Sequence, residues 1–273
     1  MAYTINGVNV SDYGIIPGRI DGSNIAVSGW LNLPIRMGET SHEWAESDGV
    51  EPYVLADEID FAGIDITFSG VIKGTRVDCI GKIQDLLSAV NALSGTFIFS
   101  TPYGDFEVYL KNLTTKQETT VLSINLIFHQ PVVSFPALTL PSTATAKSSI
   151  NGIPFGAFGL ILKSFPDYAI AEMREQDLTV YNAERFKKTK RSIKKVTIEC
   201  VFAAPSVGEF ISRGKLLRKL FSDPGTKEIR LNDSLLFSAY ATDGFEVSGI
   251  TTYGDSMIAD FKIQLIIYTE STL

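Results

Sequence analysis

The sequence predicts an α+β fold that is mainly β, with two tandem β-sandwich or rolled-sheet domains and one flanking α-helix in each. A repeat is the first observation behind this prediction. Thr4-Ile5-Asn6-Gly7 recurs as Ser149-Ile150-Asn151-Gly152, and Tyr13-Gly14-Ile15-Ile16 recurs as Phe158-Gly159-Leu160-Ile161, both at a shift of 145 residues. The second observation is that each half shows several alternating strand patterns but a single helical pattern. Because one helix covers only part of a sheet, each sheet is expected to roll up beside its helix.

The first half contains a strand, a capped helix and further strands in that order. Ile64, Ile66, Phe68 and Ile72 alternate with polar residues, which indicates a half-buried strand. Thr75 and Asp78 match a capping box, and apolar residues follow at helical spacing, so a helix is expected near 75–93. Gly95 is expected to adopt a left-handed conformation and to end this helix. Strands are expected near 96–101, 105–113 and 120–130.

The second half repeats this order. Val196, Ile198 and Cys200 lie on one face of a predicted strand. Ser206 and Glu209 match a full capping box for a helix near 206–222, which Asp223-Pro224-Gly225 ends. A closing strand is expected through 261–267. We therefore divide the chain into an acidic first domain (1–135), a linker (136–148) rich in Pro, Ser, Thr and Ala, and a second domain (149–273) that is a divergent copy.

Charge is distributed unequally between the halves. Residues 1–145 carry 7 Lys and Arg against 16 Asp and Glu, whereas residues 146–273 carry 17 against 15. An acidic half joined to a slightly basic half is typical of proteins that associate through unlike surfaces. The two cysteines, Cys79 and Cys200, lie in different halves, and free buried thiols are favoured over a disulfide.

The repeats differ most in the segment before the central strand. In the first copy, residues 38–60 hold a run of acids with two aromatic residues, which we call the acidic segment or acidic loop. In the second copy, residues 185–195 hold a run of cations at the same place. We predict that these segments form a subunit interface, either within a chain or between neighbours, through complementary charges and aromatic anchors. The proposed interface residues are Glu39, Glu43, Trp44, Glu46, Asp48, Tyr53, Asp57, Glu58, Asp60, Arg185, Lys187, Lys188, Lys190, Arg191, Lys194 and Lys195. The alternatives are two solvated loops, or a phosphate contact by the basic run.

The sequence contains no recognisable catalytic, cofactor or metal motif. The two histidines, His42 and His129, have no partner at ligand spacing, and phosphate-loop, dinucleotide and nucleophile-elbow patterns are missing. We therefore predict no enzymatic activity, no cofactor and no metal site. Two further alternatives stay open for the acidic loop: it could bind a cation, or Trp44 and Tyr53 could stack on a sugar.

The opening segments resemble a known family. Ile5-Asn6-Gly7-Val8-Asn9-Val10-Ser11-Asp12-Tyr13-Gly14 is similar to the start of the distal tail proteins and related tail-tip (baseplate hub) components of long-tailed phages. The element order in both halves resembles the tail-tube fold of that group. The resemblance implies two tail-tube-like domains and a structural role without catalytic residues. A distal tail protein usually has one such domain followed by a different one, whereas here the second is a copy of the first.

The resemblance implies a structural virion protein that forms a ring at the phage tail tip, around the tail channel. An alternative is a tail-tube protein whose duplicated domains form trimeric, pseudo-hexameric rings. An alternative of another class is a monomeric β-sandwich module that binds carbohydrate or a host surface. The implied partners are further copies of the chain, as a trimer or hexamer, and the adjacent tube, hub and tape-measure proteins. DNA would only pass through the channel. We expect no membrane association, synthesis in the host cytoplasm and a final location in the virion.

Overall fold

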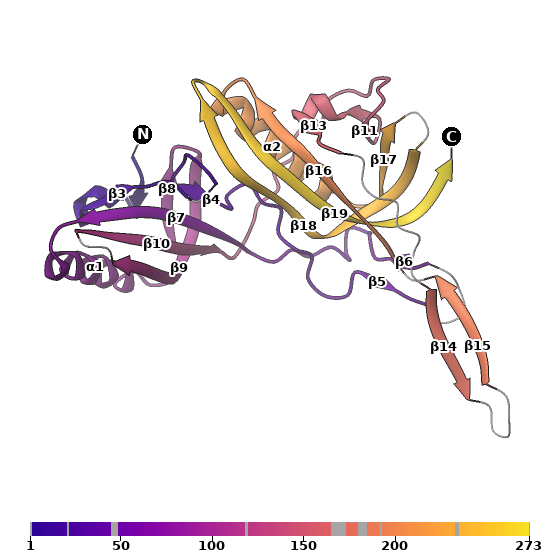
Figure 1. Ribbon diagram of the computed structural model, residues 1–273, viewed down its shortest axis with the longest axis horizontal. Coiled ribbons are helices and arrows are strands. Elements are labelled where there is room, and N and C mark those ends of the chain that lie inside the picture. The colour runs from indigo at the N-terminus through magenta and orange to yellow at the C-terminus, as the bar shows by residue number, and fades with distance from the viewer. Residues whose placement is uncertain are drawn as a thin grey trace.

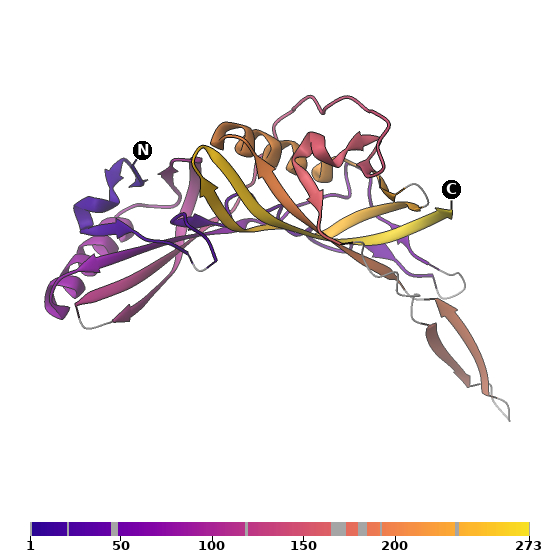
Figure 2. The same cartoon turned by 45° about the horizontal axis from the view of Figure 1, so that its top comes forward.

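The computed structural model describes the chain except residues 1, 21, 45–48, 118–119, 165–172, 180–184, 192, 233–234 and 273. It gives only the backbone of 173–179, 185–191, 232, 235 and 269–272. Strands are the most abundant secondary structure of the described residues and form two large curled sheets, with one α-helix against each (Figures 1 and 2). The predicted α+β, mainly β fold is therefore confirmed.

The first sheet is formed by residues 4–130 and has the strand order β2-β1-β8-β9-β10-β7-β3, with β4 also paired to β7. All its pairs are antiparallel. Its elements are β1 (Thr4–Ile5), β2 (Val8–Asn9), the short helix η1 (Val10–Tyr13), β3 (Ile15–Pro17), β4 (Val27–Ser28), β7 (Ile64–Lys73), α1 (Arg76–Asn91), β8 (Phe97–Thr101), β9 (Gly104–Gln117) and β10 (Val121–Gln130). The alternation predicted for the central strand is present, because Ile66, Phe68 and Ile72 are fully buried.

The second sheet is formed by residues 149–272 and has the order β12-β11-β17-β18-β19-β16-β13. Element by element, this is the order of the first sheet, with one α-helix after the same strand. Its elements are β11 (Ser149–Ile150), β12 (Ile153–Pro154), η2 (Phe155–Phe158), β13 (Leu160–Leu162), β16 (Lys194–Ala204), α2 (Val207–Ser222), β17 (Lys227–Asn232), β18 (Leu235–Tyr253) and β19 (Ser256–Thr272). Two small hairpins complete the chain: β5 (Ser41–His42) with β6 (Glu51–Pro52), and β14 (Met173–Thr179) with β15 (Arg185–Arg191).

The repeated sequence motif forms the same local structure twice. Asn6 and Asn151 adopt φ angles of 48° and 52°, a left-handed conformation that asparagine tolerates better than most residues. Each is followed by a two-residue strand and a short helix that ends at a left-handed glycine, Gly14 or Gly159. A Cβ at Gly159 would lie 2.2 Å from the carbonyl oxygen of Ala203, so only glycine fits there.

The helices begin where the sequence predicts. At α1, Thr75 Oγ1 accepts from the Asp78 amide and Asp78 Oδ2 accepts from the Thr75 amide, both at 3.3 Å, so this capping box is complete. At α2, Ser206 Oγ accepts from the Glu209 amide at 3.2 Å. The full box predicted there is wrong, because the Glu209 carboxylate instead accepts from Arg213 at 2.9 Å. An arginine one turn later competes for the carboxylate.

The cores of the two halves are joined. Cys79 and Cys200 are buried free thiols, as predicted. Buried apolar residues from both sheets form one continuous cluster. Trp30 lies at the junction: its ring stacks on Tyr103 of the first half, with centroids 4.9 Å apart, and lies 6.4 Å from Phe210 of α2. The first half therefore contributes to the core of the second.

Residues 132–148 contain no helix or strand and separate the two sheets along the chain, at the predicted linker 136–148. The segment between β4 and β7, however, belongs to the first half in sequence and packs against the second sheet. Leu31 is buried beside Gly214 of α2, where a Cβ would lie 2.6 Å from Leu31 Cδ2. The division into domains 1–135 and 149–273, and their origin by duplication, stay predictions.

We expect Leu31→Ala to lower the free energy of unfolding by about 2–5 kcal/mol, because it opens a cavity over α2. Gly214→Ala should stabilise this variant, since alanine is better in a helix by about 1 kcal/mol and its methyl group enters the vacated space. In the unaltered chain the same Gly214→Ala change should give no such gain, because Leu31 occupies that space. Urea denaturation of the four proteins measures this, and equal effects of Gly214→Ala in both backgrounds would contradict the packing.

Candidate assembly site

The segment that follows β4 runs along the edge of β18. The Leu33 amide donates to the Phe245 carbonyl at 3.0 Å, and the Arg36 amide donates to the Thr242 carbonyl at 2.8 Å. Asn32 Oδ1 accepts from the Val247 amide at 2.8 Å. Because β17 pairs only with Leu235–Ala239, the rest of this edge of β18 is open to the segment around β4. The segment protects a strand edge that would otherwise be open.

Hydrogen bonds to the same edge continue toward the C-terminal end of β18. The Asn24 amide donates to the Ile250 carbonyl at 3.1 Å, and the Asn24 side chain exchanges two hydrogen bonds with the Thr252 backbone, at 2.8 and 3.0 Å. Residues 24–36 therefore bond to the edge of β18 at both of their ends, while β4 between these ends pairs with β7 of the first sheet. We call residues 24–36 the crossing segment.

Arg218 of α2 holds the crossing segment from its other side. Its guanidinium donates to the carbonyl oxygens of Trp30, Leu31 and Asn32 over 2.7–3.1 Å. Burial lowers the pKa of Arg218 to about 10, so the group is still charged at neutral pH. Hydrogen bonds from a charged donor are stronger than neutral ones. Arg218 therefore satisfies three backbone acceptors that the crossing segment leaves unpaired.

The predicted acidic segment lies on the second half of its own chain. Val50 packs with Tyr240 and Ile266, and Val54 and Ile193 pack against the same small cluster. Arg36 donates to the carbonyl oxygens of Tyr53 and Glu58. Since Ile193 follows β15, the acidic segment and the base of the basic hairpin meet at one end of the molecule (Figure 1).

The aromatic residues of the acidic segment differ in exposure. Trp44 is 55% exposed, its indole N–H donates to Glu51 at 2.9 Å, and its ring meets the ring of His42 at 4.4 Å. Tyr53 is half-buried, and its amide donates to Thr40. Trp44 is thus presented at the surface, whereas Tyr53 helps to fix the loop.

The charged residues of the predicted interface are only partly placed. Exposed side chains are those of Glu39, Glu43, Asp57, Asp60 and Lys195, while Glu58 and Lys194 are half-buried. Glu58 also accepts from the Leu55 amide at 2.8 Å, so it is part of the loop's own structure. Glu46 and Asp48 lie outside the described residues, as do the side chains of Arg185, Lys187, Lys188, Lys190 and Arg191. Charge pairing between the segments therefore stays a prediction.

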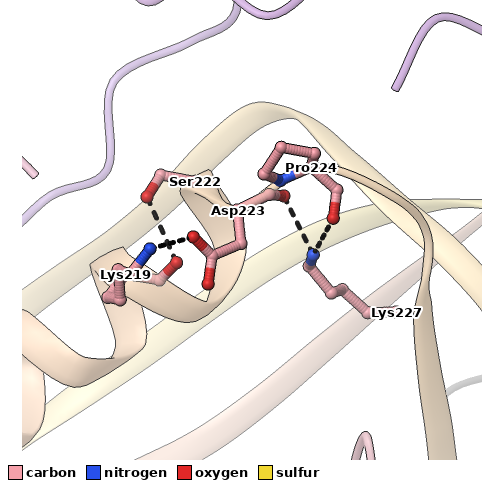
Figure 3. Close-up of polar contacts among 5 residues, drawn as sticks. All are labelled: Lys219, Ser222, Asp223, Pro224 and Lys227. Carbon is pink, nitrogen blue, oxygen red and sulfur yellow. Dashed lines mark hydrogen bonds and ion pairs between the residues drawn. The ribbon is translucent and has the colours of Figure 1, made fainter. Parts of the chain in front are cut away.

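A buried lysine at the start of β17 lies beside the C-terminal end of α2. Lys227 is 4% exposed and its ammonium donates to the carbonyl oxygens of Asp223 and Pro224 at 2.9 and 3.0 Å, while Lys219 pairs with the Asp223 carboxylate (Figure 3). Carbonyls at a helix C-terminus lack partners within the helix and attract cations. Burial lowers the pKa of Lys227 to about 8. The loop between α2 and β17 also contacts the acidic segment, because the Gly225 amide donates to the Val54 carbonyl at 2.7 Å.

A groove of about 600 Å³ lies where the two sheets meet, lined by residues of both halves. In it, Asp65 accepts from Lys111 and pairs with His129, each at 2.6 Å. Burial would raise the pKa of Asp65, but the hydrogen bonds from Lys111 and His129 outweigh it and lower the pKa. A carboxylate held by two basic groups suits a structural contact at this junction. In the described ranges, no three His, Cys, Asp or Glu side chains gather closely enough to hold a metal ion.

Sequence reasoning missed the residues that join the halves. Gly214 and Arg218 interrupt the apolar pattern of α2, and Lys227 follows the helix stop, but nothing in a single sequence says which segment meets them. A position-by-position comparison of the two repeats could have singled out Gly214 and Arg218. In α1, the positions that correspond to Gly214 and Arg218 are Ile83 and Leu87.

No protein-family model and no curated protein matches this sequence. A search of solved structures finds a similarity to the crystal structure of the SPP1 Dit (gp 19.1) protein, described as a paradigm of the hub adsorption apparatus in phages that infect Gram-positive bacteria. The similarity covers 98% of this chain and 99% of that chain, at 11% sequence identity and a TM-score of 0.38. A TM-score this low carries no argument. In the described part of the chain, no helix is long and apolar enough to cross a membrane.

Replacing Arg218 by Met should lower the free energy of unfolding by roughly 3–5 kcal/mol, because buried carbonyls lose a charged donor. The amides of Leu33 and Arg36 should also exchange their hydrogens faster. Lys215→Met, an exposed change on the same helix, is the control and should stay within about 0.5 kcal/mol. Urea denaturation and hydrogen exchange measure both effects, and unchanged exchange in the crossing segment would count against the assigned role.

Stability should depend on pH through Lys227. Its pKa is lowered from 10.5 to about 8, so the unfolded chain binds more protons between these values and stability contributed by this group rises with pH there. The unfolding free energy of the native chain minus that of Lys227→Met should therefore increase from pH 7.5 to 10, by at most about 3 kcal/mol. Denaturation of both proteins across this range tests it, and a constant difference would be inconsistent with the buried ammonium.

Proposed function

We propose that this chain is a structural component of a phage tail tip that assembles with copies of itself into a ring around the tail channel. The observation that carries the proposal is the repeated sheet order, with the same Asn-Gly turn and short helix at the start of each copy. Those starting residues are the ones that resemble distal tail proteins. In this proposal the chain is located in the virion, is made in the host cytoplasm, and has no catalytic role.

The joint between the halves supports an assembly role. The crossing segment, Arg218 and Trp30 tie the two sheets into one body, so the angle between them is fixed. A rigid pair of similar domains is what a ring needs, because each chain then occupies two consecutive positions around the circle. Three chains would supply six such domains and six chains would supply twelve. Adjacent tube, hub and tape-measure proteins are the proposed neighbours above and below.

A second candidate function rests on Trp44. An exposed indole whose N–H is fixed by Glu51 presents a flat apolar face, which is the usual platform for a sugar ring. A monomeric protein that binds carbohydrate or a host surface would use this face. In a ring, the same residue would serve as an anchor for a protein partner.

The purified protein should elute as a closed oligomer of three or six chains in size-exclusion chromatography with light scattering. Negative-stain electron microscopy should show particles with a central opening, because rigid subunits that associate head to tail close into rings when their rotation allows it. A monomer of 29.9 kDa at every concentration would contradict the ring. If such a monomer binds glycans, and Trp44→Ala removes the binding, the second function holds.

A further inference from the structure

A small cavity lies where the acidic segment meets the second sheet. Its volume is about 10 Å³, and it is lined by Arg36 of the crossing segment, Lys227 of β17 and Tyr240 of β18. These three residues are only 9%, 4% and 3% exposed, respectively. Ile59 of the acidic segment and Phe221 of α2 add apolar walls. Three polar side chains are therefore withdrawn from solvent around one small space.

Two polar atoms of these side chains lack a partner. In the described part of the chain, Arg36 Nε and Tyr240 Oη are buried and make no hydrogen bond. The other end of the Arg36 guanidinium is in use, since Nη2 donates to the carbonyl oxygens of Tyr53 and Glu58. Ser41 lies near the Tyr240 hydroxyl without a hydrogen bond between them. Because a buried donor without an acceptor is costly, these two atoms indicate a ligand that accepts hydrogen bonds.

Acceptors in the same walls are already engaged. The Val54 carbonyl accepts from the Gly225 amide, and the Asp223 carbonyl accepts from Lys227 at 2.9 Å. The Asp223 carboxylate pairs with Lys219 (Figure 3). A water molecule donates two hydrogens of its own and would need free acceptors, whereas an anion only accepts. The lining therefore suits an anion better than it suits water.

The charges around the cavity favour the same ligand. Arg36, Lys219 and Lys227 are positive, and Lys227 keeps its proton at pH 7 because burial lowers its pKa only to about 8. The opposing carboxylates are those of Asp223, which pairs with Lys219, and Glu58, whose charge acts on Arg36. Three cations against two carboxylates leave one positive charge. Since buried charge is unfavourable unless it is compensated, one monovalent anion would complete the balance.

We propose that this cavity binds one monovalent anion of the size of chloride, held by Arg36 Nε–H and the Tyr240 hydroxyl. Lys227 adds a third donor, because its ammonium has three hydrogens and only two of them bond to Asp223 and Pro224. A space of about 10 Å³ holds one water molecule, and chloride is only slightly larger. Because Arg36 also binds carbonyls of the acidic segment, the anion ties that segment to β17 and β18.

Crystals of the full chain grown in sodium bromide test the site directly, because bromide can replace chloride and is identified by its anomalous scattering. The expected result is an anomalous peak within hydrogen-bond distance of Arg36 Nε and Tyr240 Oη. Density at that point without an anomalous signal would assign it to water and overturn the proposal. The same conclusion would follow if the cavity showed no density at all.

Thermal unfolding measures the same binding in solution. An ion that binds only the folded chain raises the unfolding midpoint as its concentration increases. The midpoint should therefore rise when chloride replaces isethionate, a larger organic anion, at constant ionic strength. The Gly225 amide, which bonds to Val54 of the acidic segment, should also exchange its hydrogen more slowly in chloride. A bromide peak without any change of the midpoint would mean binding at crystal concentration only, and would overturn the proposal.

Two tyrosine variants separate this site from general effects of salt. Tyr240→Phe keeps the ring and removes one donor to the ion, so the chloride concentration needed for half of the shift should rise roughly ten- to hundredfold. Tyr253→Phe is the matched control, because Tyr253 lies on the same strand and is 66% exposed, and it should keep the native response. An equal response in both variants would contradict the proposal. None of these measurements depends on how many chains associate, so failure of the anion site would leave the proposed ring standing.

Discussion

The arrangement of the whole molecule depends on the covered edge of β18. A strand edge presents backbone donors and acceptors that need partners, and here the partners come from the other half of the chain. Trp30, Leu31 and Leu33 are almost fully buried in this contact. Each contributes roughly 1.5–3 kcal/mol, a considerable fraction of the 5–15 kcal/mol that stabilises an ordinary domain. The two halves therefore share one core despite their separate sheets.

Two residues of α2 make this contact possible. Gly214 removes a side chain where Leu31 must enter, and its cost to the helix is about 1 kcal/mol relative to alanine. Arg218 then supplies donors to carbonyls that have no strand beside them. A glycine in the middle of a helix is unusual, and so is an arginine that is buried there. Gly214 and Arg218 occur in α2, where the crossing segment packs on the helix, and are replaced by Ile83 and Leu87 in α1.

Sequence reasoning found the features that depend on local interactions. The N-caps at Thr75 and Ser206, the helices and the alternating strands are fixed within a few residues, so they can be predicted from sequence. The reciprocal bond expected at Ser206 failed because Arg213 is a better partner for Glu209. The crossing segment was beyond reach, since it depends on contacts between residues almost two hundred positions apart. The acidic run was noticed, but its anchors Arg36 and Val50 carry no recognisable pattern.

The joint also bears on the ring proposed for this chain. A contact between unlike ends produces a closed ring only if the rotation from one unit to the next divides the circle evenly, and otherwise produces an open helix. In the proposed ring, every second rotation would be set inside a chain, by the angle at which Trp30 and Arg218 hold the two sheets. Local charge at the outer ends would affect the rate and register of association but not this angle. The geometry of the proposed ring would therefore depend on the buried junction as well as on the contact between the exposed ends.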